Sequence, residues 1–133
     1  MFAHVSQLGS LIKGAENLLV DNGLFVTESH YLLDLIDTVQ YDSIYHEHLK
    51  YYSAKSISKL FEYYNFTVID IDRIPNYGGS IRVYARKGKS HEVSNNVTNL
   101  IKEEVDRGLY EKSIYEDFTK KIKMSKLQLQ NLI

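Results

Sequence analysis

Apolar residues recur at steps of three and four residues near the start of the chain, which predicts an amphipathic helix over residues 8–19. Ser6 is the expected N-cap of this helix, and the Asp-Asn-Gly sequence at residues 21–23 is typical of a helix end and turn. The mostly apolar residues 24–28 then predict a short strand buried on both faces of a parallel sheet. This order of helix, turn and strand forms half of a βαβ unit.

The same periodicity predicts a short helix over residues 31–39 and a longer helix that Ser53 caps and Asn65 ends. Between them, residues 41–52 are mostly polar, which indicates a loop containing some turn. Two predicted helices therefore flank residues 41–52, which show no helical or strand periodicity of apolar residues.

Two further strands are predicted at residues 67–71 and 80–86, the second with a clear alternation of apolar and polar positions. A turn at residues 75–79 joins them, so we expect an antiparallel pair. Taken together, these elements indicate an α/β fold and the C-terminal half of a sheet domain.

The character of the chain changes after this strand pair. Residues 89–96 form a polar linker, one helical stripe ends at Gly108, and another covers residues 113–133. These helices have no predicted strand to cover, so they either dock on the sheet, swap between subunits or lead into another domain. We therefore expect a sheet domain over residues 1–87 and a linker with helices over residues 88–133.

Composition limits the classes of function. The 133 residues suit one domain, and a net charge of −1 gives no electrostatic footprint for nucleic acid. The absence of cysteine excludes disulfides, thiolate nucleophiles and cysteine zinc sites. No apolar run is long enough to span a membrane and no signal peptide is evident, so we expect a cytoplasmic protein with neither a nucleic-acid nor a membrane partner.

The polar stretch at residues 41–52 contains two histidines, two acidic residues and four tyrosines, a density that indicates a site. If the segment forms a turn, Tyr45 and His48 share one side. An imidazole base beside a phenol would suit proton transfer to or from a substrate.

If the segment is extended, His46 and His48 share a face instead, which would suit a metal. A catalytic zinc site needs a third ligand, for which His4 and His30 are candidates. A purely structural network of satisfied polar groups is the third interpretation, and the residues alone leave all three open.

The Tyr-Gly-Gly-Ser sequence at residues 77–80 either binds phosphate through its amides or forms a plain turn between strands. Glu28 falls at the end of a predicted parallel strand, where open α/β sheets bind ligands, and has either a ligand-binding or a supporting role. Arg82 and Arg86 alternate on the following strand and are more typical of solvated positions. No Gly-x-Gly-x-x-Gly loop, Walker loop or serine nucleophile elbow occurs.

Several motifs occur in the order found in one enzyme family. The chain resembles the S-adenosylmethionine-dependent sugar C-methyltransferases that act on nucleotide-linked 4-keto-deoxyhexoses. The motifs lie at residues 2–5, 23–28, 31–35, 41–48 and 78–84. The resemblance covers residues 1–87, and residues 88–133 resemble the helices that lead into the C-terminal domain of that family.

The resemblance implies the C-terminal half of a class I, Rossmann-like methyltransferase sheet and a catalytic mechanism. In that mechanism a base removes the proton next to the 4-keto group, and the enolate attacks the methyl sulfonium. The matching base is His48, Tyr45 and Glu47 match residues beside the sugar, and His4 matches a histidine across the sugar pocket. The residues that we expect to bind the nucleotide-sugar substrate are Glu28, Tyr77, Gly78, Gly79 and Arg82.

The resemblance also implies parts that these 133 residues lack: a cysteine-rich, zinc-binding N-terminal domain and the glycine-rich loop that binds S-adenosylmethionine. We therefore expect a fragment that is inactive alone. The alternatives are a non-catalytic interaction module, half of a split enzyme, or a metal-dependent enzyme. A half sheet would expose an unpaired edge, through which copies of the chain could associate.

Overall fold

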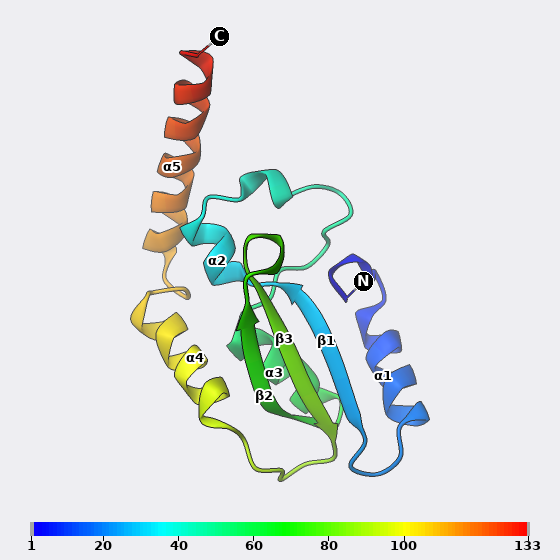
Figure 1. Ribbon diagram of the computed structural model, residues 1–133. Coiled ribbons are helices and arrows are strands. Elements are labelled where there is room, and N and C mark those ends of the chain that lie inside the picture. Colours follow the sequence, from blue (N-terminus) through cyan, green and yellow to red (C-terminus); the bar gives the residue numbers. More distant parts are fainter. Residues whose placement is uncertain (1, 133) are drawn as a thin grey trace.

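The computed structural model describes residues 2–132 as a small sheet with helices packed around it (Figure 1). The α-helices are α1 (Leu8–Leu18), α2 (Leu32–Asp37), α3 (Ala54–Tyr63), α4 (Asn95–Asp106) and α5 (Lys112–Gln130). The strands are β1 (Leu24–His30), β2 (Phe66–Ile74) and β3 (Ser80–Lys87). Short 3₁₀ turns are η1 (Phe2–His4), η2 (Tyr41–Ser43) and η3 (Asn76–Gly78).

The strands form one sheet in the order β1-β3-β2, with β3 antiparallel to both neighbours. The predicted antiparallel pair, β2 and β3, is confirmed. The prediction that residues 24–28 form a strand buried in a parallel sheet is wrong for the described residues, because β1 is an edge strand paired antiparallel to β3. Leu24 and Val26 accordingly remain 45% and 44% exposed.

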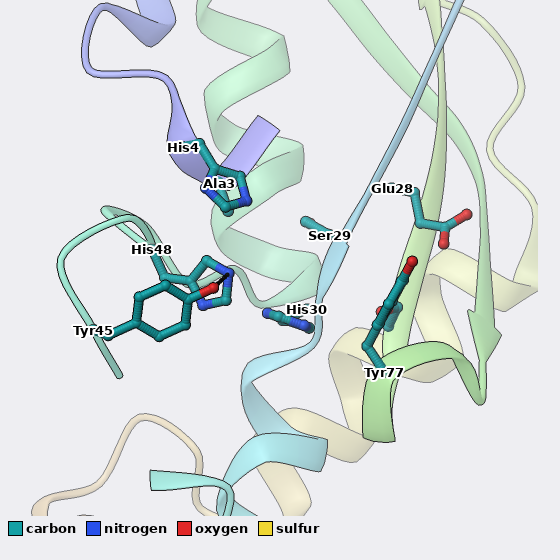
Figure 2. Close-up of a pocket in the computed structure, with 9 residues that line it drawn as sticks. Ala3, His4, Glu28, Ser29, His30, Tyr45, His48 and Tyr77 are labelled. Carbon is teal, nitrogen blue, oxygen red and sulfur yellow. Dashed lines mark hydrogen bonds between the residues drawn. The ribbon is translucent and has the colours of Figure 1, made fainter. Parts of the chain in front are cut away.

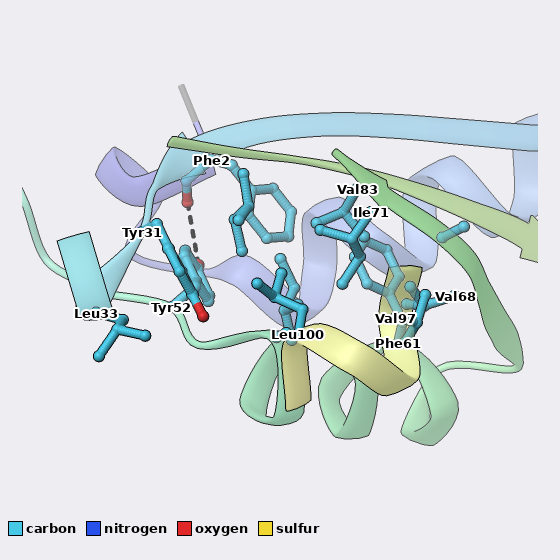
Figure 3. Packing of buried hydrophobic residues seen from close by; sticks show 14 of the residues in the cluster. Phe2, Tyr31, Leu33, Tyr52, Phe61, Val68, Ile71, Val83, Val97 and Leu100 are labelled. Carbon is cyan, nitrogen blue, oxygen red and sulfur yellow. Dashed lines mark hydrogen bonds between the residues drawn. The ribbon is translucent and has the colours of Figure 1, made fainter. Parts of the chain in front are cut away.

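One face of the sheet carries the core. The predicted alternation in β3 is confirmed, since Ile81, Val83 and Ala85 are fully buried. Helix α3 covers this face, and the Phe61 ring lies 5.9 Å from that of Phe2 in a stacked arrangement (Figure 3). Such buried aromatic pairs add packing energy beyond the apolar area that they remove from water.

The helix ends follow local sequence signals to different degrees. Ser53 caps α3 as predicted, because its hydroxyl accepts from the Ser56 backbone N–H and the Ser56 hydroxyl accepts from the Ser53 N–H. Asn65 follows α3 with a φ of 61°, which terminates the helix. The predicted N-cap Ser6 is wrong, because α1 begins at Leu8 and its N-cap, Gln7, makes no side-chain capping bond.

Helix α4 docks on the body of the protein, so the first of the alternatives, docking on the sheet, holds for this helix. It contacts β2 and α3 and contributes Val97 and Leu100 to the core (Figure 3). Helix α5 instead projects away from the sheet (Figure 1), and Phe118 is its buried residue. The two C-terminal helices therefore differ in how strongly they are held.

A buried carboxyl group connects α4 to the start of α3. Glu104 is fully buried and accepts hydrogen bonds from the Tyr31 hydroxyl at 3.0 Å, the Lys55 N–H at 3.1 Å, the Ala54 N–H and the Tyr110 hydroxyl. Burial, reinforced by Glu104, raises the pKa of the Tyr31 and Tyr110 hydroxyls well above their usual range, so both remain donors. Glu104 thus satisfies backbone donors at the α3 N-terminus from outside that helix.

None of the helices described over residues 2–132 is long and apolar enough to cross a membrane. The sheet leaves β1 and β2 as edge strands. Association of copies through such an edge stays a prediction.

Replacing Glu104 with Ala is expected to lower the free energy of unfolding by roughly 3 kcal/mol, because buried donors on α3 and two tyrosines lose their acceptor. A drop of roughly 10 °C in Tm would follow, measured by thermal unfolding under circular dichroism. Asp106→Ala on the same helix is the matched control, since Asp106 is exposed and pairs with Lys102 alone. Equal melting temperatures for the two variants would refute the structural role of Glu104.

Candidate active site

An open cavity of about 460 Å³ lies where β1 ends, between η1, the loop over residues 41–52 and the η3 turn (Figure 2). Residues singled out from the sequence make up most of its lining, namely His4, Glu28, His30, Tyr45, His48 and Tyr77. Its lining is completed by Ala3, Ser29 and Ser80. The fold therefore gathers side chains from four separate segments.

The loop adopts the turn arrangement rather than the extended one. The His48 N–H donates to the Tyr45 carbonyl at 3.0 Å, which closes a turn. The side chains lie on the same side, with the Tyr45 hydroxyl 3.1 Å from His48 Nε2. This places a phenol in hydrogen-bond contact with an imidazole, as proton transfer requires.

Hydrogen bonds fix the tautomer of His48. Its Nδ1 lies 2.7 Å from the carbonyl oxygen of Ser43, and since a carbonyl can only accept, Nδ1 carries the proton. In the neutral imidazole, Nε2 then has a free lone pair and accepts from the Tyr45 hydroxyl. The Tyr51 hydroxyl donates to the same Ser43 carbonyl at 3.2 Å, which further holds this acceptor in place.

Contacts with η1 hold the loop over the cavity. The Leu49 N–H donates to the Ala3 carbonyl at 3.1 Å, and Lys50 Nζ donates to the Val5 carbonyl at 2.7 Å. These bonds bring the His4 and His48 rings to within 4.9 Å of each other. His4 is itself exposed, on the side of the cavity formed by η1 (Figure 2).

His30 adds an imidazole that the sequence suggested only as a metal ligand. Its ring lies 4.8 Å from that of His48 and 6.2 Å from that of Tyr77 (Figure 2). Burial, together with the neighbouring His48 and His4, lowers the pKa of His30. Its position two residues after Glu28 in β1 was the available signal, because residues two apart on a strand share a face.

Glu28 lines the cavity with its carboxylate already paired. Asn76 Nδ2 donates to it at 3.0 Å and the Arg82 guanidinium at 2.9 Å. The Asn76 hydrogen bond, followed by that of Arg82, lowers the pKa of this carboxyl group. Arg82 does not line the cavity and instead orients Glu28.

The glycine turn separates into two parts. Tyr77 has a φ of 52°, an uncommon conformation for an aromatic residue, and its 81% exposed side chain stands at the cavity rim. Gly78 and Gly79 lie away from this cavity: the Gly78 carbonyl accepts from Gln40 at 2.6 Å, and a Cβ on Gly79 would collide with Asp34. The glycines therefore form a close-packed turn, and phosphate binding through its amides stays a prediction.

Two neighbours of His48 lie outside the cavity. His46 is 89% exposed, and its Nε2 lies 4.0 Å from the Glu47 carboxylate, which is also exposed. A role for Glu47 in the reaction stays a prediction. Over the part of the chain that the structure describes, no three histidine or acidic residues are grouped so as to hold a metal ion.

Comparisons with known proteins identify two methyltransferase family models and one relative. Residues 1–71 match a family model described as a methyltransferase domain, and residues 75–133 match one described as a C-methyltransferase C-terminal domain. The chain is 34% identical over 133 residues to the C-methyltransferase NovU of Streptomyces niveus, covering 99% of this chain and 32% of that relative. The chain thus spans about a third of the length of the relative.

We expect His30 to titrate below its ordinary value of about 6.5. The unfolded chain then binds more protons than the folded one in this range, so His30 destabilises the fold as the pH falls through 6.5 and has no such effect above it. NMR titration of the imidazole signals measures the midpoint, and denaturant unfolding at pH 7 and pH 5 measures the stability. In His30→Gln this part of the pH dependence should disappear, and a midpoint above 6.5 would contradict the assignment.

Proposed function

The chain belongs to the methyltransferase family, and from this premise we propose that it is part of a C-methyltransferase acting on a nucleotide-linked 4-keto sugar. The observation that carries the proposal is the state of His48 in the cavity wall, where Nδ1 is held by the Ser43 carbonyl and Nε2 is the acceptor nitrogen, bonded to the Tyr45 hydroxyl. An imidazole with one nitrogen protonated and a lone pair on the other can act as a general base.

In the proposed reaction His48 Nε2 removes the proton from the carbon next to the ketone. The electrons of the C–H bond form a carbon–carbon double bond, and the carbonyl electron pair moves to oxygen, giving an enolate. His48 becomes an imidazolium whose Nδ1–H remains hydrogen-bonded to the Ser43 carbonyl. The enolate carbon is then the nucleophile for the new C–C bond.

Tyr45 and His4 support this step from two sides of the cavity. The Tyr45 hydroxyl donates to His48 Nε2 in the free protein, so an arriving substrate must displace that bond. The released hydroxyl can donate to a substrate oxygen, as can the His4 ring. We include Glu47 as a residue that approaches the substrate only if the exposed loop rearranges.

Glu28 and Tyr77 are the proposed substrate contacts. A carboxylate held by Asn76 and Arg82 retains acceptor capacity for sugar hydroxyls. Tyr77 offers an exposed aromatic face at the rim, which suits packing against a sugar or a base. Arg82 acts through Glu28, and Gly78 and Gly79 act by shaping the turn that carries Tyr77.

When bound, S-adenosylmethionine supplies an electrophilic methyl group. The residues described here do not fit a site for it: Gly78 and Gly79 close on Gln40 and Asp34, and no Gly-x-Gly-x-x-Gly follows a strand in the sequence. We propose that these 133 residues supply enolate formation, that neither the methyl donor nor the family's zinc is held by them, and that alone they do not transfer a methyl group.

Replacing His48 with Asn in the full-length protein should abolish exchange of the sugar proton next to the ketone with solvent deuterium. Asn keeps a polar side chain but has no basic nitrogen, so nucleotide-sugar binding should be largely retained. Exchange is followed by proton NMR and binding by calorimetry, with the exposed His46→Asn as the matched control. Unchanged exchange in His48→Asn would remove His48 as the base.

The 133-residue chain should bind S-adenosylmethionine very weakly or not at all, because these residues lack the glycine-rich loop that would hold the cofactor. Isothermal titration calorimetry measures this directly. A dissociation constant in the micromolar range, about −8 kcal/mol of binding free energy, would overturn the prediction.

A further inference from the structure

The third imidazole of the cavity has no assigned task in the proposed reaction. His30 lines the cavity beside His48, and within residues 2–132 its ring nitrogens have no hydrogen-bond partner. A half-buried imidazole with free nitrogens is a hydrogen-bonding group available to a ligand. Its neighbours show which part of the ligand it can reach.

We propose that His30 is a further catalytic residue, whose ring N–H donates a hydrogen bond to the ketone oxygen as the enolate forms. The inference rests on the proposed function, since it assigns an electrophilic partner to the base His48. In the balanced step, His48 takes the proton from carbon while negative charge develops on the oxygen that His30 contacts. His30 itself neither gains nor loses a proton.

The spacing of the two rings suits two adjacent positions on one substrate. The His30 and His48 rings lie 4.8 Å apart and nearly perpendicular, at 75°. The carbon that loses its proton and the ketone oxygen are only two bonds apart. Hydrogen-bond contacts are about 3 Å long. Rings at this separation can therefore contact both atoms at once, His48 at the carbon and His30 at the oxygen.

The backbone holds His30 firmly. It is the last residue of β1, where it pairs with Ser80 of β3. The following residue, Tyr31, is fully buried and donates its N–H to the Gly79 carbonyl at 3.2 Å. Donors fixed in advance at the position of developing charge are the effective ones in catalysis, because they need no reorganisation during the reaction.

Other groups of the cavity are less suited to this task. The Tyr45 hydroxyl is bonded to His48 until the substrate displaces it, so it is not fixed in advance on the ketone oxygen, and the Glu28 carboxylate only accepts hydrogen bonds. His4 is exposed, whereas His30 is partly shielded from water, where a hydrogen bond to a developing charge is stronger. The lowered pKa of His30 agrees with a neutral ring, which donates its N–H and does not take up the substrate proton.

The test compares donor-free and donor-keeping variants in the full-length protein. His30→Phe and His30→Leu lack the N–H, whereas His30→Gln keeps an amide donor. The probe is thymidine-diphosphate-linked 4-keto-6-deoxyglucose in deuterium oxide. We expect exchange of its proton next to the ketone to fall about 100-fold in the donor-free variants and no more than about tenfold in His30→Gln.

A spectroscopic readout separates polarisation from a merely structural effect. In the wild type the carbonyl stretching band of the bound probe should shift to lower frequency. That shift should be lost in His30→Phe and His30→Leu and largely kept in His30→Gln. His46 is an exposed imidazole on the same loop as His48. His46→Phe is therefore the matched control and should leave the exchange rate and the band unchanged.

The outcomes distinguish the two proposals. If His48→Asn abolishes exchange while a folded donor-free variant keeps the wild-type rate and band position, His30 is not catalytic and the proposed function stands. If the wild type bearing both imidazoles shows no exchange, the proposed function fails, and the role of His30 fails with it. His30→Phe and His30→Leu differ in side-chain shape, so one variant still gives a result if the other does not fold.

Discussion

The insertion of β3 between β1 and β2 is the interaction on which the site depends. Because β3 runs antiparallel to both neighbours, its first residue, Ser80, pairs with the last residue of β1, His30. The turn that precedes β3 therefore brings Tyr77 beside the end of β1. Without that pairing, the two walls of the cavity would belong to unconnected parts of the chain.

Local signals in the sequence predicted where helices and strands form better than they predicted which elements pack side by side. The alternation in β3 and the Ser53 cap depend on residues a few positions apart, and both were confirmed. The edge position of residues 24–28 depends on which strand lies beside them, and the apolar pattern of β1 does not encode it. Glu104 was missed for the same reason, because its partners lie about 50 and 73 residues away in the sequence.

The site was predicted to the extent that one short segment contains it. Tyr45 and His48 are three residues apart, so a turn alone brings them together. The separation of Gly79 from the cavity and the position of His30 follow from packing against α2 and from strand pairing, respectively. The methyltransferase-domain match and the α/β fold agree with the expected Rossmann-like class. In such a fold the whole sheet determines how helices and turns pack against it.

Two imidazoles of the same chemical type can act differently because their surroundings differ. The Ser43 carbonyl holds the Nδ1 proton of His48 and so stabilises the imidazolium that forms when Nε2 takes up a proton. His30 has no such acceptor among residues 2–132, and its partial burial opposes a charge on its ring. The lowered pKa of His30 favours a neutral ring, which can still donate its N–H to a ligand. In the proposed reaction, this separation of base and donor by environment assigns the two parts of an enolisation to two residues of one cavity.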